Sequence, residues 1–540
     1  MPEYLAPGVY IEEVATGPRP IEGVSTSTTG FVGETERGPS RPRMVTSWQD
    51  YQRWYGGYID RPPFTAAPFA VASDVLPYAV RGFFDNGGQR LFIARVTGPN
   101  APTATINLPG AAGPTVVRAV GPGAWGNQIL IAVRAASLAV PNTITARWFR
   151  ILVLYYRQLP PGFPAGFVDP TDPTQLGNPA RVPPDASEDF DNLTDDSTRP
   201  NYVRTQVNAA SQLIEITASP GAPNIPVLFT AGRLQTGGPD PVPTATEYVG
   251  SDAGAPEDRR GLEGLCAVRE ISLMSIPATN LPNALDALQN RCDGMRDRFA
   301  IRNVLPPSND YTQVRPPSDT SYGAIYYPDL LVAAPHTPEG WRYVPPSGHV
   351  AGIYARVDVE RGVHKAPANE VVRGIITRDL AGGQKPLRYT LNKREHDVLN
   401  PRGVNVIRDF RMDGRDIRVW GARTMSSDSM WKYVNVRRLF IFIEQSIDRG
   451  TQWAVFEPNS ELTWIAIRTA ITNFLRTIWR NGALMGVTEE EAFFVKCDRT
   501  TMTQDDFDNG RLICLIGVAP VKPAEFVIFR ISQKTIEAES

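Results

Sequence analysis

The sequence predicts a multi-domain α/β (α+β) protein, and three patterns carry that prediction. Short apolar runs alternate with helical segments between residues 30 and 104 and again between 259 and 329, which is typical of an α/β domain. A proline-rich stretch of β-type runs, residues 105–258, separates these two halves. Long amphipathic helices follow within residues 330–522, and an isolated β-type run stands near each end of the chain.

Composition is that of an ordinary globular protein. Of the 540 residues, 42% are hydrophobic and 21% are charged, so the chain can build a sizeable core in two to four domains. The net charge of −2 shows no excess that would favour nucleic acid or an anionic membrane. The 49 prolines indicate long irregular connections.

Neither export nor membrane insertion is expected. Met1-Pro2-Glu3-Tyr4 shows no basic segment followed by an apolar one, so we expect synthesis in the cytoplasm without a signal peptide. The apolar run from Leu512 to Val521 is shorter than the roughly 18 residues that a membrane span requires. The four cysteines lack CxxC spacing and are interpreted as free thiols: Cys266, Cys292, Cys497 and Cys514.

The predicted middle domain, residues 30–104 plus 259–329, alternates strands and helices. In its first half, Ser47 is expected to cap a short helix that ends at Tyr55, and a second helix spans residues 68–84. In its second half, a helix over 283–298 places apolar side chains at helical spacing. The expected strands are Gly30–Gly33, Leu91–Val96, Ile271–Ile276 and Phe299–Val304.

Residues 105–258 are predicted to form an inserted, peripheral β-rich domain. Its expected strands are Thr115–Val120, Gln128–Val133, Arg150–Tyr155 and Gln212–Thr217. The acidic cluster from Asp185 to Asp196 lacks the glycine of a calcium loop and is interpreted as solvated loop. Gly121 to Gly126 matches GxGxxG, but a strand rather than a helix follows, so we interpret the glycines as a tight turn between strands.

The segment 330–522 is predicted to be a C-terminal domain. A helix begins at Pro345-Pro346-Ser347, and Asp413-Gly414 forms a hairpin turn between two strands. Asn459 or Ser460 caps a long helix with one apolar stripe: Trp464, Ile467, Ile471, Phe474 and Ile478. A helix over 436–448 precedes it, and the remaining expected strands are Thr451–Phe456, Glu491–Cys497 and Arg511–Val518.

Both chain ends carry a short strand with no hairpin partner nearby. Residues 1–29 form an arm and linker, and residues 523–540 form a second arm. A strand that is apolar on both faces needs a neighbour to pair with. The side chains expected to enter neighbouring subunits are Val9, Tyr10, Ile11, Val14, Phe526, Val527, Ile528, Phe529 and Ile531.

Catalytic, cofactor and metal sites are not predicted. The four histidines lack the spacing of an HExxH pair, and the chain contains neither a GxSxG elbow nor a phosphate-binding GxxxxGK[ST] loop. His349, near a helix start, is interpreted as structural. The C-terminal helices have a basic side that is either a solvated face or a surface for an acidic partner: Arg437, Arg438, Arg468, Arg476 and Arg480.

Several sequence blocks resemble contractile tail sheath proteins, which form the sheaths of contractile-tailed phages and of phage-tail-like injection systems. The resemblance covers about 1–35 and 260–533. Its N-terminal blocks are residues 7–13 and 23–33, and its C-terminal blocks are residues 346–352, 365–369, 397–401, 418–424, 432–438 and 509–512.

The resemblance implies a structural role, part of a phage virion or a tail-like particle. It implies hexameric rings of this chain stacked around an inner tube protein, with baseplate and terminal cap or collar proteins at the ends. The arms would add strands to neighbouring subunits, and the stalks 16–23 and 518–525 would act as hinges while the sheath contracts and drives the tube through a target envelope. The basic side chains above would then face the tube.

Two alternatives stay open at this point. One is another structural component of the same kind of particle. The other is an enzyme with a site in the 260–360 region, which requires a nucleophile and a base within reach of each other in a cleft.

Overall fold

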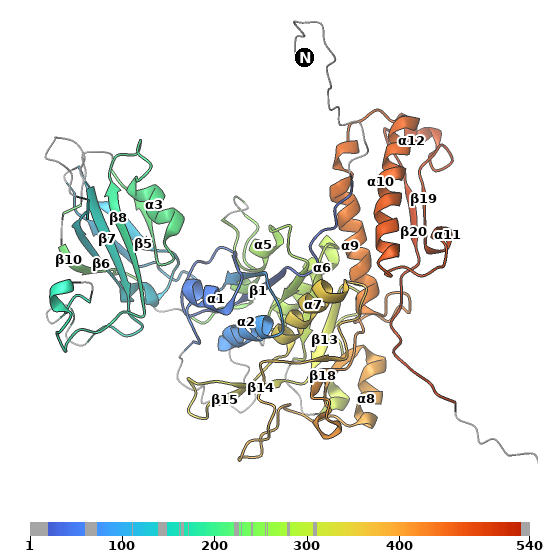
Figure 1. The fold of residues 1–540 in the computed structure, drawn as a ribbon, viewed down its shortest axis with the longest axis horizontal. Helices are drawn as coiled ribbons and strands as arrows, with labels where there is room; N and C mark the ends of the chain where they lie inside the picture. Colours follow the sequence, from blue (N-terminus) through green and yellow to red (C-terminus); the bar gives the residue numbers. More distant parts are fainter. Residues whose placement is uncertain are drawn as a thin grey trace, which may run out of the picture. The chain divides into compact units, whose positions relative to one another are not determined.

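The computed structural model describes residues 20–530 apart from 60–72, 111, 139–147, 161–162, 164–166, 171, 221–225, 228, 239–240, 254, 256–257, 278–280 and 306–309. The chain divides into two compact units (Figure 1). The larger contains residues 25–362 and 366–434, and the smaller contains 1–24, 363–365 and 435–540. Each unit is described by itself.

The larger unit is built on a nine-stranded sheet with the order β16-β18-β17-β13-β12-β11-β1-β3-β2. From β17 to β3 neighbouring strands run parallel, and β16, β18 and β2 add antiparallel edges. The strands are β1 (Thr29–Gly33), β2 (Arg43–Val45), β3 (Leu91–Arg95), β11 (Leu273–Ser275), β12 (Phe299–Asn303), β13 (Gly323–Tyr327), β16 (Glu370–Val371), β17 (Val404–Asp409) and β18 (Ile417–Val419). The predicted α/β fold is confirmed.

Helices cover both faces of this sheet because successive strand residues point to opposite sides. Phe31 of β1 meets Phe83 of α2 (Leu76–Asp85) edge to face. Phe299 of β12 lies on the same side, against Tyr354 of α7 (Ser347–Arg361). Val32 faces the other way, into a core formed with α5 (Gly261–Cys266) and α6 (Pro282–Met295).

Helices α2 and α7 cross at glycines that allow a very close approach. A Cβ atom added to Gly82 of α2 would lie 2.4 Å from the His349 ring, and one added to Gly348 would lie 2.5 Å from Ala79 Cα. Real Cβ atoms do not approach other atoms so closely, so only glycine fits at either position. The Gly348-to-Gly352 block therefore has a packing role.

The inserted segment forms a four-stranded sheet, β10-β6-β7-β8, and a three-stranded sheet, β4-β5-β9, around one apolar core. Its elements are β4 (Thr105–Leu108), β5 (Thr115–Ala119), β6 (Ile129–Ala135), β7 (Trp148–Tyr155), β8 (Ala186–Thr194), α3 (Val203–Ala210), β9 (Ile214–Ala218), β10 (Phe229–Arg233) and α4 (Ala245–Val249). The GxGxxG segment is a turn, with Gly123 at φ 117° before a 3₁₀ turn and β6.

The acidic cluster was predicted to be loop, and that prediction is wrong. Residues 186–194 form the edge strand β8, and Asp189 pairs with Arg150 of β7. Charged side chains on an edge strand keep it from pairing with other chains. An acidic run thus reads as loop from composition although it is a protected strand.

The smaller unit consists of helices with a short hairpin (Figure 1). Its elements are α9 (Val434–Gly450), α10 (Glu461–Arg480), α11 (Glu489–Ala492), β19 (Phe493–Lys496), α12 (Gln504–Asp508) and β20 (Leu515–Val518). The predicted stripe of α10 is buried from Trp464 to Ile478, and most of it packs with α9. The strand expected at Thr451–Phe456 is wrong, because Gln452–Ala454 form a 3₁₀ turn and Phe456 has φ 68°.

The expected domain start at residue 330 differs from the division that the chain shows. Strand β13 pairs with β17, so residues up to Val434 complete the large sheet and the smaller unit begins at residue 435. The larger unit also contains α1 (Trp48–Tyr55), which begins at the predicted cap Ser47, together with β14 (Leu330–Ala333), β15 (Trp341–Val344) and α8 (Lys393–Leu399). The helix expected over 68–84 is described from residue 76 onward as α2.

Candidate functional site

The candidate site is the β19–β20 hairpin of the smaller unit. Its strands are antiparallel, with Phe493 opposite Val518 and Lys496 opposite Leu515. Among the described residues these two strands form a sheet of their own. A two-stranded sheet leaves backbone N–H and C=O groups unpaired along its outer edges, and such edges accept further strands.

The two faces of the hairpin differ. Phe493, Val495 and Val518 pack against the core that includes α10. On the outer face Phe494 is 58% exposed, and its ring lies across Gly517, where an added Cβ would be 2.2 Å away. Leu515 and Ile516 are also exposed. The hairpin is therefore anchored on one side and offers apolar surface on the other.

The chain leaves this hairpin along a fixed path and then becomes exposed. Met485 N–H donates to Ala519, and Val521 N–H donates to the Ala483 carbonyl at 3.2 Å. The Asn435 side-chain amide donates to the Val521 carbonyl, also at 3.2 Å. The hinge expected over 518–525 is thus restricted in its first half.

The predicted C-terminal arm strand is unpaired in the single chain. Within residues 521–530 the structure shows no helix or strand. Four consecutive apolar side chains are 68–83% exposed: Phe526, Val527, Ile528 and Phe529. Ile531 lies outside the described residues, as do Val9, Tyr10, Ile11 and Val14 of the N-terminal arm.

The described part of the N-terminal stalk is packed rather than free. Ile21 is buried in the core of the smaller unit and lies against Gly450, the last residue of α9. Val24 N–H donates to the Ser446 hydroxyl at 3.1 Å. Residues 20–24 therefore run along α9, and the predicted hinge cannot extend through Gly23.

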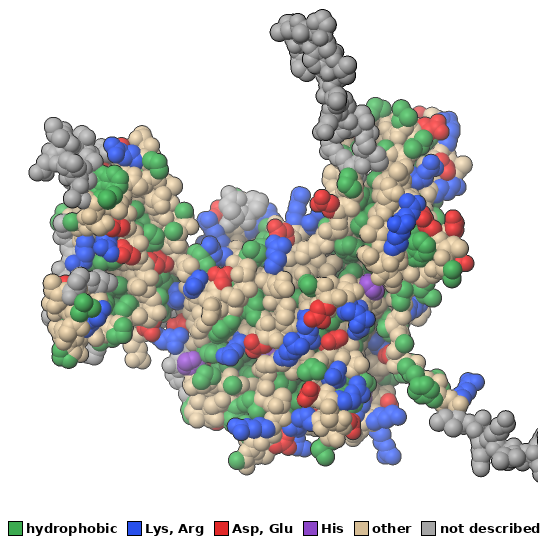
Figure 2. Space-filling view, in the orientation of Figure 1, with side chains coloured by type: hydrophobic (Ala, Val, Ile, Leu, Met, Phe, Trp, Pro, Cys, Tyr) green, Lys and Arg blue, Asp and Glu red, His purple; other side chains and the backbone are tan. Residues whose placement is uncertain are grey.

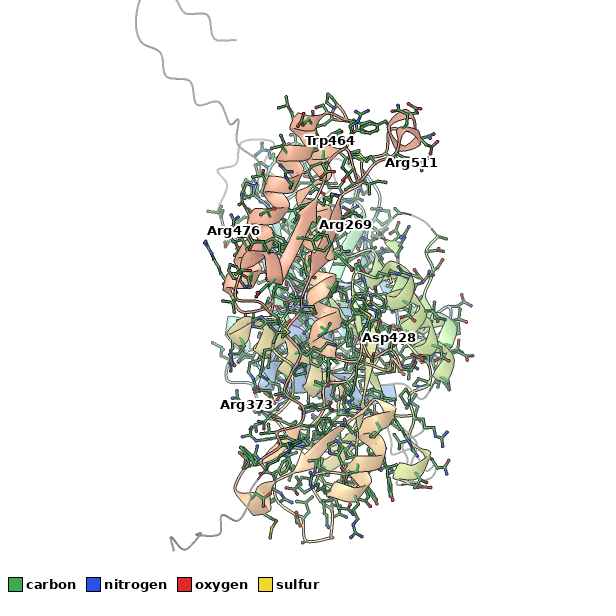
Figure 3. All side chains as sticks on the ribbon, turned by 90° about the vertical axis from the view of Figure 1, so that its right-hand side faces the viewer. Arg269, Arg373, Asp428, Trp464, Arg476 and Arg511 are labelled. Carbon is green, nitrogen blue, oxygen red and sulfur yellow. The ribbon has the colours of Figure 1, made fainter. Side chains whose placement is uncertain are left out.

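The five predicted basic residues do not form one surface. Arg437 and Arg438 of α9 are only 6% and 4% exposed. Arg468 and Arg480 of α10 are exposed, whereas Arg476 pairs with Glu489 at 2.7 Å (Figure 3). The guanidinium of Arg476 holds the pKa of Glu489 below its ordinary value. Helix α10 can thus present Arg468 and Arg480 to a partner, and the α9 pair cannot be reached from solvent.

Groups that could support catalysis are buried or separate. Burial lowers the pKa of His349 to about 4, so the imidazole is neutral at pH 7. The cysteines are free thiols, and burial raises the pKa of Cys266 to about 11. In the described part of the chain, His, Cys, Asp and Glu do not gather in groups of three or more that could hold a metal ion. Among the described helices, none is long and apolar enough to cross a membrane.

Sequence reasoning missed the acceptor role of β19–β20. The strands themselves were expected near residues 491–497 and 511–518, but their pairing and their open edges depend on contacts that local patterns do not record. It also missed an arginine cluster on β17 and β18. Its members, Arg408, Arg415 and Arg418, are spread over eleven positions and meet only through strand register.

Comparison with known proteins gives consistent matches. Residues 268–425 match the phage tail sheath protein central domain, and residues 426–534 match the phage tail sheath C-terminal domain. A putative prophage major tail sheath protein of Pseudomonas aeruginosa is 27% identical over 46% of this chain and 62% of its own length. The tail sheath protein of Enterobacteria phage T4 is 27% identical over 34% of this chain and 26% of its own length. The matched segments thus span less than two thirds of these relatives.

Solved structures match nearly the whole chain. The helical sheath of the anti-feeding prophage in its contracted state aligns with a TM-score of 0.55 and 23% identity, covering 98% of this chain and 100% of that one. A sheath tail protein from Listeria innocua aligns with a TM-score of 0.54 and 12% identity over 93% and 96%. At these identities the likeness concerns the fold.

Proposed function

The chain belongs to the contractile tail sheath family, and we propose that it is a structural subunit that polymerises into a contractile cylinder around an inner tube. Subunits form stacked six-fold rings, joined by strands that each chain donates to its neighbours. A baseplate and a terminal cap bound the cylinder. The particle is a phage tail or a tail-like injection device.

One observation carries this proposal: the smaller unit contains both an open two-stranded sheet and an unpaired apolar segment. The β19–β20 edges can accept a strand, and residues 526–529 can supply one. Each backbone hydrogen bond formed contributes about 1 kcal/mol net. Burial of a Phe or Ile side chain adds roughly 2 kcal/mol. A donated strand of this length therefore outweighs the cost of ordering it.

Strand donation allows subunits to move without separating. Residues 522–525 connect the donated segment to the fixed path that ends at Val521. Rotation at this short connection lets units shift as rigid bodies while the backbone hydrogen bonds between subunits persist. Contraction then runs from a metastable lattice to a better-packed one, and it requires no catalytic step by this chain.

The experiment compares the purified full chain with a chain that ends at Lys522. We expect the full chain to form cylinders by negative-stain electron microscopy and the truncated chain to remain as folded single subunits. Residues 523–530 lie outside the helices and strands of the smaller unit, so thermal unfolding should change little. Cylinders of normal length from the truncated chain would refute the proposal.

Point substitutions sharpen this test. Phe526→Asp with Ile528→Asp should abolish assembly as the truncation does, because charged side chains cannot enter an apolar interface. The matched control is Leu176→Asp with Val242→Asp, which replaces two equally exposed apolar side chains of the inserted segment. The control variant should assemble like the unmodified chain.

A further inference from the structure

Three arginines meet at the β17–β18 hairpin of the larger unit. Arg408 and Arg418 are directly opposite each other in the antiparallel register, so their side chains share one face. Arg415 lies in the connecting turn. The guanidinium of Arg408 lies 4.8 Å from the centre of the Phe410 ring, and that of Arg415 lies 5.3 Å from the same ring.

This cluster is unbalanced in charge. Like charges directly opposite on a sheet are destabilising. The side-chain hydrogen bonds of Arg415 and Arg418 go to neutral oxygens, namely the Asn369 side chain and the backbone carbonyls of Asn369 and Arg415. Within the described part of the chain, none of the ion pairs includes any of the three arginines, and the buried Nε of Arg408 has no acceptor.

Nearby carboxylates are already engaged. Asp409, between the two strands' arginines, pairs with Arg411 at 2.7 Å, and Arg411 also binds Asp379 at 2.9 Å. Two further exposed cations, Arg373 and Arg378, lie on the segment that follows β16 (Figure 3 labels Arg373). We call the five residues the arginine surface: Arg373, Arg378, Arg408, Arg415 and Arg418. Figure 2 shows Lys and Arg side chains gathered over the region of β18 and α8.

The smaller unit carries a matching acidic segment. Glu489, Glu490 and Glu491 form the first turn of α11 and lead directly into β19. Glu490 and Glu491 are exposed, whereas Glu489 pairs with Arg476. The segment adjoins the hairpin that is proposed to accept a neighbour's strand, so in the cylinder it lies beside another copy of the chain.

We propose that the arginine surface of one copy docks on the Glu489–Glu491 segment of a second copy in the assembled cylinder. This inference rests on the proposed function and deepens it by naming a second contact between subunits. Guanidinium and carboxylate groups form paired hydrogen bonds with defined geometry. The contact aligns the larger unit of one subunit with the smaller unit of the next, while the donated strand supplies most of the affinity.

The test is a charge exchange in the full chain. Arg415→Glu with Arg418→Glu should reduce the yield of cylinders by roughly tenfold, because several attractions between subunits become repulsions. Glu490→Lys with Glu491→Lys should reduce it similarly. The combined four-residue variant should recover assembly, and so should an equimolar mixture of the two defective variants. The matched control, Arg53→Glu with Arg204→Glu, changes two exposed arginines elsewhere and should assemble normally.

Each outcome decides the matter. Thermal unfolding of every variant confirms that it is folded before assembly is scored. Normal cylinders from the arginine variant would overturn the proposal, and so would a loss of assembly that the glutamate exchange does not restore, since the partner would then be something other than a second copy. If the chain ending at Lys522 fails to assemble while the charge variants assemble normally, strand donation stands and this contact alone is rejected.

Discussion

At the scale of single residues, His349 shows how burial sets protonation. The side chain is 1% exposed in α7, and burial lowers its pKa from an ordinary 6.5 to about 4. In the unfolded chain the same imidazole takes up a proton below pH 6.5. Folding therefore excludes a proton between pH 6.5 and 4, and the structure loses stability across that window as the pH falls.

This gives a pH prediction. The free energy of unfolding should be fully supported by His349 above pH 6.5 and should fall by about 3 kcal/mol as the pH drops to 4, beyond the loss due to other groups. In His349→Gln that component is absent. Denaturant titrations of both proteins at several pH values should show their stabilities converging toward pH 4, and curves that stay parallel would contradict the account.

At the scale of elements, the α2–α7 crossing depends on glycine. The two helices approach so closely that Gly82 faces the His349 ring and Gly348 faces Ala79. The crossing fixes the helical layer on one face of the large sheet through the contacts of Phe83 and Tyr354. A side chain as small as alanine would force the layer apart.

Two glycine substitutions test this packing against simple helix propensity. Gly82→Ala should lower the free energy of unfolding by about 2–3 kcal/mol because of overpacking. Gly294→Ala, in α6, has no atoms within 4 Å of the added Cβ and should raise it by up to about 1 kcal/mol. Equal effects from the two changes in thermal or denaturant unfolding would show that the crossing is looser than described.

Local signals in the sequence predicted most helices and several strands. The Ser47 cap, the α10 stripe and the end of α7 at Gly362 all match because their determinants lie within a few residues. The two-residue strand β16 and the pairing of β13 with β17 could not be predicted, since they depend on partners far along the chain. The apolar run before Phe456 misled for the same reason: its chain turns at Gln452–Ala454.

At the scale of the whole molecule, a single chain is incomplete. The sequence pattern predicted a strand at residues 526–531, yet residues 526–529 are exposed and unpaired in one chain. Periodicity can show that a segment favours a sheet, but it cannot show whose sheet it joins. The open β19–β20 hairpin supplies the missing half, and the pairing belongs to the assembly.

Amide hydrogen exchange of the C-terminal segment tests strand donation most directly. The chain should be compared as free subunits and as assembled cylinders, with the buried strands β6 and β7 as an internal standard that is protected in both. We predict that the amides of Phe526 to Phe529 exchange without protection in free subunits and become as protected as those of β19 and β20 in cylinders. Unprotected exchange of these amides in intact cylinders would contradict the account.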